Sequence, residues 1–274
     1  MEGQHAAGDW VGRYLRLLDL EREPPGLDAL ARLTRAHLLT VPFGNASALL
    51  RHRDHPGDPP PLDAEELLTQ WEEGRGTAVC LEIVYAFSRL LAALGYDARS
   101  VAGAIGFPGS HQAIVVALGG ARYLVDVGNG APFFAPLPLD RVVEVRHAGL
   151  AYRLRPGEAP GEHVQDRWIG GAWTPFCRYD LRGQGAGEWD EAYRRHHVPG
   201  QSFVIGPLRL VRCTEGAVHS LHGGELTHFT AAGKRVEQVE GPDGYERAVR
   251  EVFGVQRLPV AEALVVVEGL ESAP

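Results

Sequence analysis

The stretch GRGTAVCLEIVYAFSRLLAALG, residues 74–95, decides the fold because it places a cysteine where a helix is expected to begin. Thr77 is a candidate N-cap, and Cys80 then lies at the third helical position, in the first turn. Apolar residues follow at helical spacing: Val84, Phe87, Leu91 and Leu94. The unpaired N–H groups at a helix start stabilise a thiolate, and Arg75 just upstream adds positive charge. This geometry favours a reactive thiol, although a lone free cysteine is more often a buried small side chain.

The composition is that of an ordinary globular protein of 274 residues, 45% hydrophobic and 23% charged. This length allows one large domain or two to three small ones. The net charge of −8 argues against nucleic acid as a partner and against binding to an anionic membrane surface. No apolar run has the length of a transmembrane helix, and the N-terminal residues lack the pattern of a signal peptide. We therefore expect a cytoplasmic protein.

The cysteines and histidines do not form a metal-binding pattern. Cys80, Cys177 and Cys213 are a sparse, odd set with no short-spaced pair, so neither a disulfide framework nor a zinc ribbon is expected. We interpret Cys177 and Cys213 as buried apolar side chains. The histidine pairs with possible ligand spacing are His196 with His197, His219 with His222, and His52 with His55. No cysteine or carboxylate cluster accompanies them, and we predict no metal site.

The first part of the chain is expected to be mostly helical. Apolar stripes predict helices within residues 10–50, the second ending near Val41 because Pro42 restricts that residue to an extended conformation. Residues 52–62 are proline-rich and predict an exposed loop. Asp63 is a candidate N-cap for a short helix that leads to the cysteine.

After Gly95 the hydrophobic period changes from helical to alternating. Residues 98–105 predict a strand, and residues 112–118 and 121–127 predict a hairpin. Further strands of the same sheet or barrel are expected within residues 142–179. The remaining elements are expected at residues 190–197 (helix or loop), at 201–213, 226–229 and 234–239 (a three-stranded meander), and at 245–253 (a final helix).

The register of the hairpin brings a histidine and a carboxylate together. With a two-residue loop at Gly119 and Gly120, Ala113 lies opposite Asp126. His111 is two residues from Ala113 on the same face, which makes it a diagonal neighbour of Asp126. A three-residue loop would put the two side chains on opposite faces. The other face of the hairpin is apolar and predicts a core: Ile114, Val116, Leu118, Tyr123, Val125 and Val127.

A cysteine at a helix start, a histidine and an aspartate are the set that thiol-based acyl transfer needs. The imidazole accepts the thiol proton, the carboxylate orients the imidazole, and the thiolate attacks a thioester or ester carbonyl. The candidates are Cys80, His111 and Asp126.

At these residues the chain resembles the arylamine N-acetyltransferase family, and the resemblance extends along almost its full length. The segments that carry it are RAHLLTVPFGN (35–45), Cys80-x-Glu82 with its helix to LGY (94–96), the strand with His111, YLVDVGNG (123–130), Ser202-Phe203 and FGV (253–255). The resemblance implies an α+β fold in three parts: a helical domain (1–95), a β-barrel (96–200) and an α/β lid (201–274). It also implies that Cys80 is the nucleophile, His111 the general base and Asp126 its orienting partner, with Glu82 structural.

The departures from the family pattern concern the pocket. The family typically has Arg-Gly-Gly-x-Cys-x-Glu-x-Asn, whereas here Arg75 is displaced by one position, the second glycine is missing and Val84 replaces the asparagine. The family loop Val-Gly-Phe-Gly becomes Val-Gly-Asn-Gly, with Asn129 in the aromatic position. By resemblance the candidate pocket residues, each of which fits core packing equally well, are Phe43, Asn129, Phe133, Phe134 and Phe203.

Relatives that keep the triad and change the pocket include enzymes that close macrolactams and enzymes that perform Dieckmann cyclisation. We therefore expect release and cyclisation of a polyketide or peptide chain from the phosphopantetheine thioester of an acyl carrier protein, with a carbon nucleophile slightly favoured over nitrogen. The alternative is an acetyl-CoA-dependent arylamine N-acetyltransferase. A catalytically silent binding protein is a third hypothesis, which the intact Cys80, His111 and Asp126 disfavour. No resident cofactor is predicted.

Overall fold

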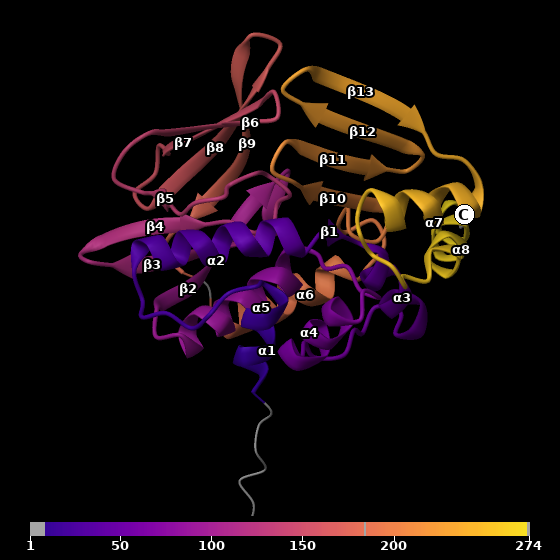
Figure 1. The fold of residues 1–274 in the computed structure, drawn as a ribbon, viewed down its shortest axis with the longest axis horizontal. Helices are drawn as coiled ribbons and strands as arrows, with labels where there is room; N and C mark the ends of the chain where they lie inside the picture. Colours follow the sequence, from indigo (N-terminus) through magenta and orange to yellow (C-terminus); the bar gives the residue numbers. More distant parts are fainter. Residues whose placement is uncertain (1–8, 184, 273–274) are drawn as a thin grey trace, which may run out of the picture.

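A computed structural model of the chain describes residues 9–183 and 185–272. Helices come first, followed by an eight-stranded antiparallel sheet and a five-stranded antiparallel sheet, with one helix between the sheets and two after them. Figure 1 shows the two sheets side by side above the N-terminal helices. Among the described residues, no helix is long and apolar enough to cross a membrane.

The N-terminal helices follow the predicted signals. They are α1 (Trp10–Leu17), α2 (Leu27–Thr40), α3 (Ala46–Asp54) and α4 (Ala64–Glu72). Helix α2 ends where Val41 becomes extended before Pro42, and Asp63 caps α4 by accepting from the backbone N–H of Glu65 at 2.8 Å. Both predictions are confirmed. Helix α3 extends into the segment predicted as a loop, as far as Asp54.

Helix α5 (Cys80–Ala93) starts at the cysteine itself, so the prediction that Thr77 is its N-cap is wrong. The hydroxyl of Thr77 instead accepts from the backbone N–H of Ser47 at the start of α3, 3.3 Å away. Glu82 reaches back to accept from the N–H of Val79 at 2.9 Å. Cys80 is therefore the first helical residue, where its N–H has no intrahelical partner.

The eight-stranded sheet forms a nearly closed barrel in the order β5-β4-β3-β2-β9-β8-β7-β6. Its strands are β2 (Asp97–Ile105), β3 (Phe107–Leu118), β4 (Ala121–Val125), β5 (Leu137–Pro138), β6 (Val143–His147), β7 (Leu150–Pro156), β8 (Glu162–Ile169) and β9 (Ala172–Asp180). The strands predicted within residues 98–127 and 142–179 are confirmed.

The hairpin of β3 and β4 has the predicted two-residue loop and register, with Leu118 paired to Ala121 and Ile114 to Val125. Both of its faces are buried. The predicted apolar face packs into the helical core with Phe87 of α5, while the face that carries Ala113 packs inside the barrel. Leu118 and Tyr123, at the open end of the hairpin, are only half-buried.

The five-stranded sheet has the order β1-β10-β11-β12-β13 and corrects the predicted three-stranded meander. Its strands are β1 (Phe43–Gly44), β10 (Arg209–Cys213), β11 (Ala217–His222), β12 (Glu225–Thr230) and β13 (Gly233–Gln238). Strand β11 was not predicted, because polar residues interrupt the alternation of apolar and polar side chains in AVHSLH. Strand β1, which follows Pro42 directly, joins the N-terminal segment to this sheet through β10.

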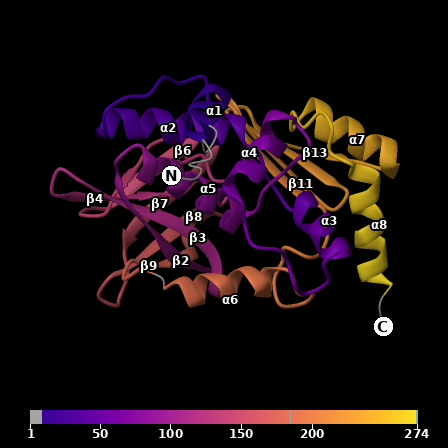
Figure 2. The same ribbon diagram turned by 90° about the horizontal axis from the view of Figure 1, so that it is seen from below.

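Three further helices complete the fold: α6 (Ala186–His196), α7 (Gly241–Glu251) and α8 (Val260–Glu271). The prediction that the helix near residues 245–253 is the final one is wrong, because α8 follows it. Figure 2 shows α6 beside the barrel, near β2 and β9, and α7 and α8 at the other end of the molecule. Leu210, Val249 and Phe253 share one apolar core, so α7 covers a face of the five-stranded sheet.

Candidate active site

Cys80 lies where the start of α5 meets the loop that follows β4. This close approach requires a glycine at position 128, because a Cβ there would lie 3.0 Å from the Cα and the Cβ of Cys80. Behind the cysteine, the buried Glu82 forms an ion pair with Arg51 of α3. Arg51 also contacts the Nε2 atom of His197 at 3.2 Å. The start of α5 is thus tied to α3 through Arg51.

His111 of β3 and Asp126 after β4 form the pair that the hairpin register predicts. The Nε2 atom of His111 lies 2.9 Å from Oδ2 of Asp126, and each residue is 1% exposed. Gly103 of β2 pairs with His111 across the sheet, and a Cβ at that glycine would lie 3.0 Å from the imidazole Cδ2. The predicted contact between His111 and Asp126 is confirmed.

The Cys80 thiol lies 4.0 Å from the carbonyl oxygen of Ser110, the residue that precedes His111. Since Nε2 of His111 faces Asp126, Nδ1 is the imidazole nitrogen left for a thiol proton. Burial by itself lowers the pKa of His111, but the Asp126 carboxylate and the Cys80 side chain outweigh burial and raise this pKa well above its usual value. A protonated imidazole beside a thiol stabilises the thiolate. A thiol, an imidazole and a carboxylate in this order are able to serve as nucleophile, base and orienting group.

Asp126 is held by four donors. Besides His111 it accepts from the hydroxyl of Tyr179 at 2.6 Å, from Nδ2 of Asn129 at 2.8 Å and from the backbone N–H of Gly128 at 3.1 Å. Four hydrogen bonds fix the position of this buried carboxylate. Gln165 of β8 joins the network, with Oε1 2.9 Å from Nδ2 of Asn129.

Tyr179 and Gln165 were not among the predicted site residues. Both belong to strands late in the chain, β9 and β8. Strand β9 pairs with β2, where Gly103 lies opposite both Tyr179 and His111, and β8 pairs with β9. In the sequence, both residues lie in segments of alternating hydrophobicity. Such a pattern predicts a strand, but it does not identify a residue of an active site.

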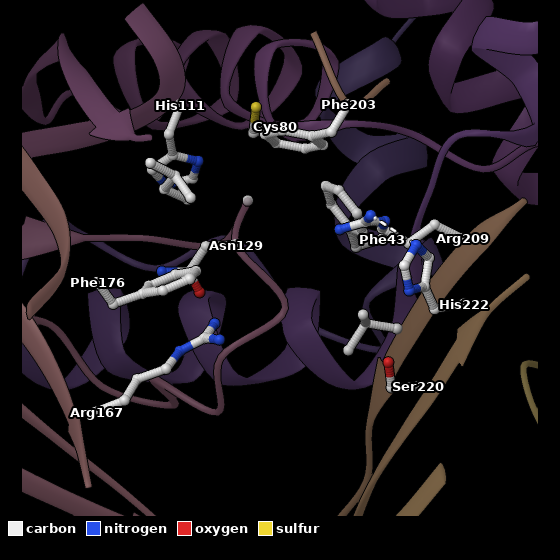
Figure 3. A pocket seen from close by; sticks show the side chains of 13 residues that line it. Phe43, Cys80, His111, Asn129, Arg167, Phe176, Phe203, Arg209, Ser220 and His222 are labelled. Carbon is white, nitrogen blue, oxygen red and sulfur yellow. Dashed lines mark hydrogen bonds between the residues drawn. The ribbon is translucent and has the colours of Figure 1, made fainter. Parts of the chain in front are cut away.

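The cysteine opens onto a cavity of about 330 Å³ between the barrel and the five-stranded sheet. Its lining residues are Phe43, Cys80, Ile105, His111, Gly128, Asn129, Arg167, Phe176, Phe203, Arg209, Val211, Ser220 and His222. Figure 3 shows Cys80 and His111 on one wall and the aromatic rings of Phe43, Phe176 and Phe203 around the space. A largely apolar cavity with a few polar groups is typical of a small-molecule site.

Three of the five predicted pocket residues line this cavity: Phe43, Phe203 and Asn129. The polar atoms of Asn129, however, are engaged with Asp126, Gln165 and the backbone N–H of Ala131. Asn129 therefore belongs to the support of the aspartate as much as to the cavity wall.

The structure corrects the predictions for Phe133 and Phe134, neither of which lines the cavity. Phe133 is 2% exposed and packs inside the barrel, edge-on to Tyr152. Phe134 packs between Arg35, whose guanidinium lies 4.9 Å from the ring centroid, and His147. From the sequence, two adjacent aromatic residues after a glycine-rich loop are compatible with a cavity wall and with a core. The sequence therefore did not distinguish between these two positions.

The other two cysteines are buried, and their thiols donate to backbone carbonyls, Cys177 to Arg178 at 3.9 Å and Cys213 to Gly130 at 3.6 Å. Burial raises the pKa of Cys177 to about 11 and the pKa of Cys213 to about 12. Both thiols stay protonated at neutral pH, and a protonated thiol is a poor nucleophile.

No group of three or more potential metal ligands lies close together within residues 9–183 and 185–272. The histidines considered as ligands have other partners. His196 contacts the Ser202 hydroxyl at 2.9 Å, His52 contacts the carbonyl of His197 at 3.0 Å, and His219 contacts His228 across β11 and β12 at 2.8 Å.

Known proteins resemble this chain in sequence and in fold. Residues 26–260 match the model of a family described as N-acetyltransferase. The chain is 30% identical over 252 residues to an arylamine N-acetyltransferase of Mycolicibacterium smegmatis, a match that covers 82% of this chain and 85% of the relative. It is also 30% identical over 174 residues to a proansamycin X synthase of Amycolatopsis mediterranei, covering 60% of this chain and 65% of the synthase.

The fold is shared with solved structures at lower identity. The arylamine N-acetyltransferase from Mycobacterium abscessus superimposes with a TM-score of 0.83 at 23% identity, and the superposition covers all of both chains.

Proposed function

Since this chain belongs to the arylamine N-acetyltransferase-like family and is an acyl-transfer enzyme, we propose that Cys80 carries the acyl group between donor and acceptor. The observation that supports this best is the buried pair of His111 and Asp126 beside the Cys80 thiol, at the wall of an apolar cavity. We assign Cys80 as nucleophile, His111 as proton carrier and Asp126 as the group that orients the imidazole.

In the first half-reaction the donor is a thioester. The proton of Cys80 moves to Nδ1 of His111, and the thiolate attacks the acyl carbonyl. The bond between that carbon and the donor sulfur breaks, and the departing sulfur takes the proton from His111. A neutral imidazole and an acyl-enzyme on Cys80 remain. Water is kept from this intermediate because Cys80 and His111 are both 1% exposed.

In the second half-reaction an acceptor N–H or C–H gives its proton to the neutral His111. The nitrogen or carbon attacks the acyl carbonyl, the bond to the Cys80 sulfur breaks, and the sulfur leaves as a thiolate paired with the imidazolium. Attack by nitrogen yields an amide, and attack by carbon yields a 1,3-dicarbonyl compound. No resident cofactor takes part in either step.

We infer that the acceptor is part of the acyl chain itself, so that transfer releases and cyclises a chain delivered by the phosphopantetheine thioester of a carrier protein. Two observations support this choice: the pocket departs from the arylamine acetyltransferase pattern at Val84 and Asn129, and one relative is named a proansamycin X synthase. A carbon nucleophile, as in Dieckmann cyclisation to a tetramate or pyridone, is slightly favoured over a nitrogen nucleophile. Phe43 and Phe203 then contact the chain.

The second candidate function is acetyl transfer from acetyl-CoA to an arylamine. The match to an arylamine N-acetyltransferase over 82% of this chain favours it. The chemistry on Cys80 is the same in both functions, so they differ in what enters the cavity after the first half-reaction.

Intact-protein mass spectrometry distinguishes these functions. The enzyme is mixed separately with acetyl-CoA and with a β-ketoamide thioester of N-acetylcysteamine. Cyclising release predicts that the thioester is consumed, with a product lighter by the lost thiol and no stable acetyl adduct. An acetyl adduct on Cys80 that an arylamine removes would instead establish the arylamine N-acetyltransferase.

The first mutational prediction concerns the nucleophile. Cys80→Ala is expected to lower turnover by about 10³-fold or more, because the acyl-enzyme cannot form. Cys177→Ala and Cys213→Ala are matched controls, buried thiols outside the cavity that are expected to keep turnover. Turnover near the wild-type rate in Cys80→Ala, with a normal circular dichroism spectrum, would contradict the mechanism.

A further inference from the structure

Two arginines face the cavity beside Cys80. Arg167 comes from β8 of the barrel and Arg209 from β10 of the five-stranded sheet, so they approach the cavity from opposite sides. Figure 3 shows the guanidinium of Arg167 below the ring of Phe176, and that of Arg209 beside Phe43 and His222. No carboxylate appears among the residues of the described chain that line this cavity.

Both arginines are half-buried, and neither has a carboxylate partner among the described residues. The Nε atom of each is buried and has no hydrogen-bond partner within the described residues. Burial lowers the pKa of both arginines, and no carboxylate offsets this effect. Holding an unpaired charge out of water is costly, so such groups are usually paired.

Several arginines near the cavity are paired with a carboxylate. Arg153 and Arg155 of β7 both bind Asp166, which directly precedes Arg167 on β8. Arg51, behind the cysteine, pairs with Glu82. Arg167 and Arg209 have no such partner among the described residues, and they differ from Arg212 of β10, whose Nε also lacks a partner there, because they line the cavity.

The groups that do contact Arg167 and Arg209 orient them without neutralising them. The guanidinium carbon of Arg167 lies 3.2 Å from the ring centroid of Phe176. Arg209 lies 5.3 Å from the ring centroid of Phe203, and its Nη2 atom is 3.0 Å from Nε2 of His222. Stacking on aromatic rings holds a guanidinium while its N–H groups stay free for a ligand.

A cavity with this lining selects for negative charge. A guanidinium binds a planar anion such as a carboxylate through two parallel hydrogen bonds, and these bonds are stronger where water is excluded. The protein as a whole carries a net charge of −8, so the positive cavity is not part of a general positive field.

We propose that this enzyme acts on a carboxylate-bearing substrate, and that Arg167 and Arg209 bind the carboxylate in the cavity beside Cys80. This inference rests on the proposed acyl transfer through Cys80 and names its substrate class. The carboxylate belongs either to the acyl chain or to the acceptor, and the two half-reactions tell these sources apart.

The first arm tests the acyl chain. Acylation of Cys80 by the succinyl thioester of N-acetylcysteamine is timed by intact-protein mass spectrometry and compared with acylation by the corresponding methyl succinyl thioester, which is neutral. If the acyl chain carries the charge, the succinyl compound reacts at least about tenfold faster at equal concentration.

The second arm tests the acceptor. The enzyme is first acetylated on Cys80, and clearance of the acetyl group by 4-aminobenzoate is compared with clearance by neutral 4-aminobenzamide. A preference of about tenfold for the benzoate assigns the carboxylate to the acceptor.

The variants Arg167→Gln and Arg209→Gln are expected to lower whichever preference the wild type shows to about twofold or less. The charged and neutral compounds are compared within one variant. A general loss of folding or rate therefore lowers both rates and leaves their ratio unchanged. Arg178→Gln is the matched control, an exposed arginine of neighbouring β9 that pairs with Glu162 outside the cavity, and it is expected to keep the preference.

Equal rates for charged and neutral compounds in both arms of the wild type would overturn the inference, as would a preference that persists in both variants. If no thioester acylates Cys80, the proposed function itself fails, and this inference fails with it.

Discussion

In the proposed mechanism both half-reactions depend on His111, since it carries a proton in one state and accepts one in the next. Burial lowers the pKa of His111, and the Asp126 carboxylate and the Cys80 side chain raise it by more than burial lowers it. The outcome is a pKa of His111 well above the usual value. The charge of Asp126 is thus as important as its shape.

Asp126→Asn keeps the shape of the side chain and removes the charge. We expect turnover to fall by about 10²- to 10⁴-fold, because the imidazole loses the group that orients it and stabilises its protonated form. A raised pKa means that His111 stays protonated until the pH rises through that value. In the variant, where burial lowers the pKa without opposition from a carboxylate, the alkaline limb of the pH–rate profile is expected to move to lower pH.

The pH–rate profile of thioester turnover checks this prediction, with Asp140→Asn, an exposed aspartate after β5, as control. An alkaline limb at the same pH in wild type and Asp126→Asn would show that Asp126 does not set the protonation of His111.

At the scale of elements, the site depends on how closely the loop after β4 approaches the start of α5. Gly128 lies at that contact, and its own N–H donates to Oδ1 of Asp126. The glycine therefore connects the position of the aspartate to the position of the cysteine. A side chain at this position separates the two elements.

Gly128→Ala is expected to lower turnover by about 100-fold, since a displacement of about 1 Å is enough to misalign reacting groups. The added Cβ meets backbone and Cβ atoms of Cys80 at 3.0 Å, and neither can rotate away. Gly216→Ala, in the turn between β10 and β11, is the control, because a Cβ there meets nothing within 4 Å and Gly216 has no positive φ. Steady-state turnover of the same thioester measures both. Wild-type turnover in Gly128→Ala would show that the contact tolerates a methyl group.

At the scale of the whole molecule, stability depends on pH through histidines that are buried in the neutral form. Burial lowers the pKa of His37, on α2, to about 3 and the pKa of His196, at the end of α6, to about 4. Unfolding exposes both to water, where the usual pKa is about 6.5. Below that value the unfolded chain binds more protons than the folded one, so stability falls as the pH falls.

The contribution of His37 is complete above about pH 6.5 and is lost between there and about pH 3, at up to about 1.4 kcal/mol per pH unit. His37→Gln is expected to make the free energy of unfolding less sensitive to acid, because glutamine does not take up a proton. Glutamine can also keep a hydrogen bond to the Tyr14 hydroxyl, which lies 3.0 Å from Nδ1 of His37 in the wild type. Urea unfolding at pH 7 and pH 5 measures the difference. The same loss of stability in wild type and variant would contradict this assignment.

The whole molecule also decides the cavity, which lies between two sheets built from segments far apart in the chain. Phe43 of β1 reaches the cavity because that strand pairs with β10, and Arg167 faces Arg209 across it. The division of the chain at residues 95 and 200 stays a prediction.

The sequence by itself determined the local elements and one part of the site. Helical periodicity located α1, α2 and α5, and the period of two with a Gly-Gly turn fixed the hairpin register that places His111 beside Asp126. These features depend on neighbours a few residues apart, whose geometry follows from the period of a helix or strand. The resemblance to a family, carried by Cys80-x-Glu82 and YLVDVGNG, added the cysteine to that pair.

Only the tertiary structure decided which side chains surround that pair. Tyr179 donates to Asp126, and Gln165 accepts from Asn129, because β9 and β8 join the sheet through β2. Phe133 lies in the core and not in the cavity because the loop after β4 turns inward. Alternation in a strand predicts which residues share a face, but it does not predict which segments pack against that face. That depends on contacts between segments more than thirty residues apart, which no local period encodes.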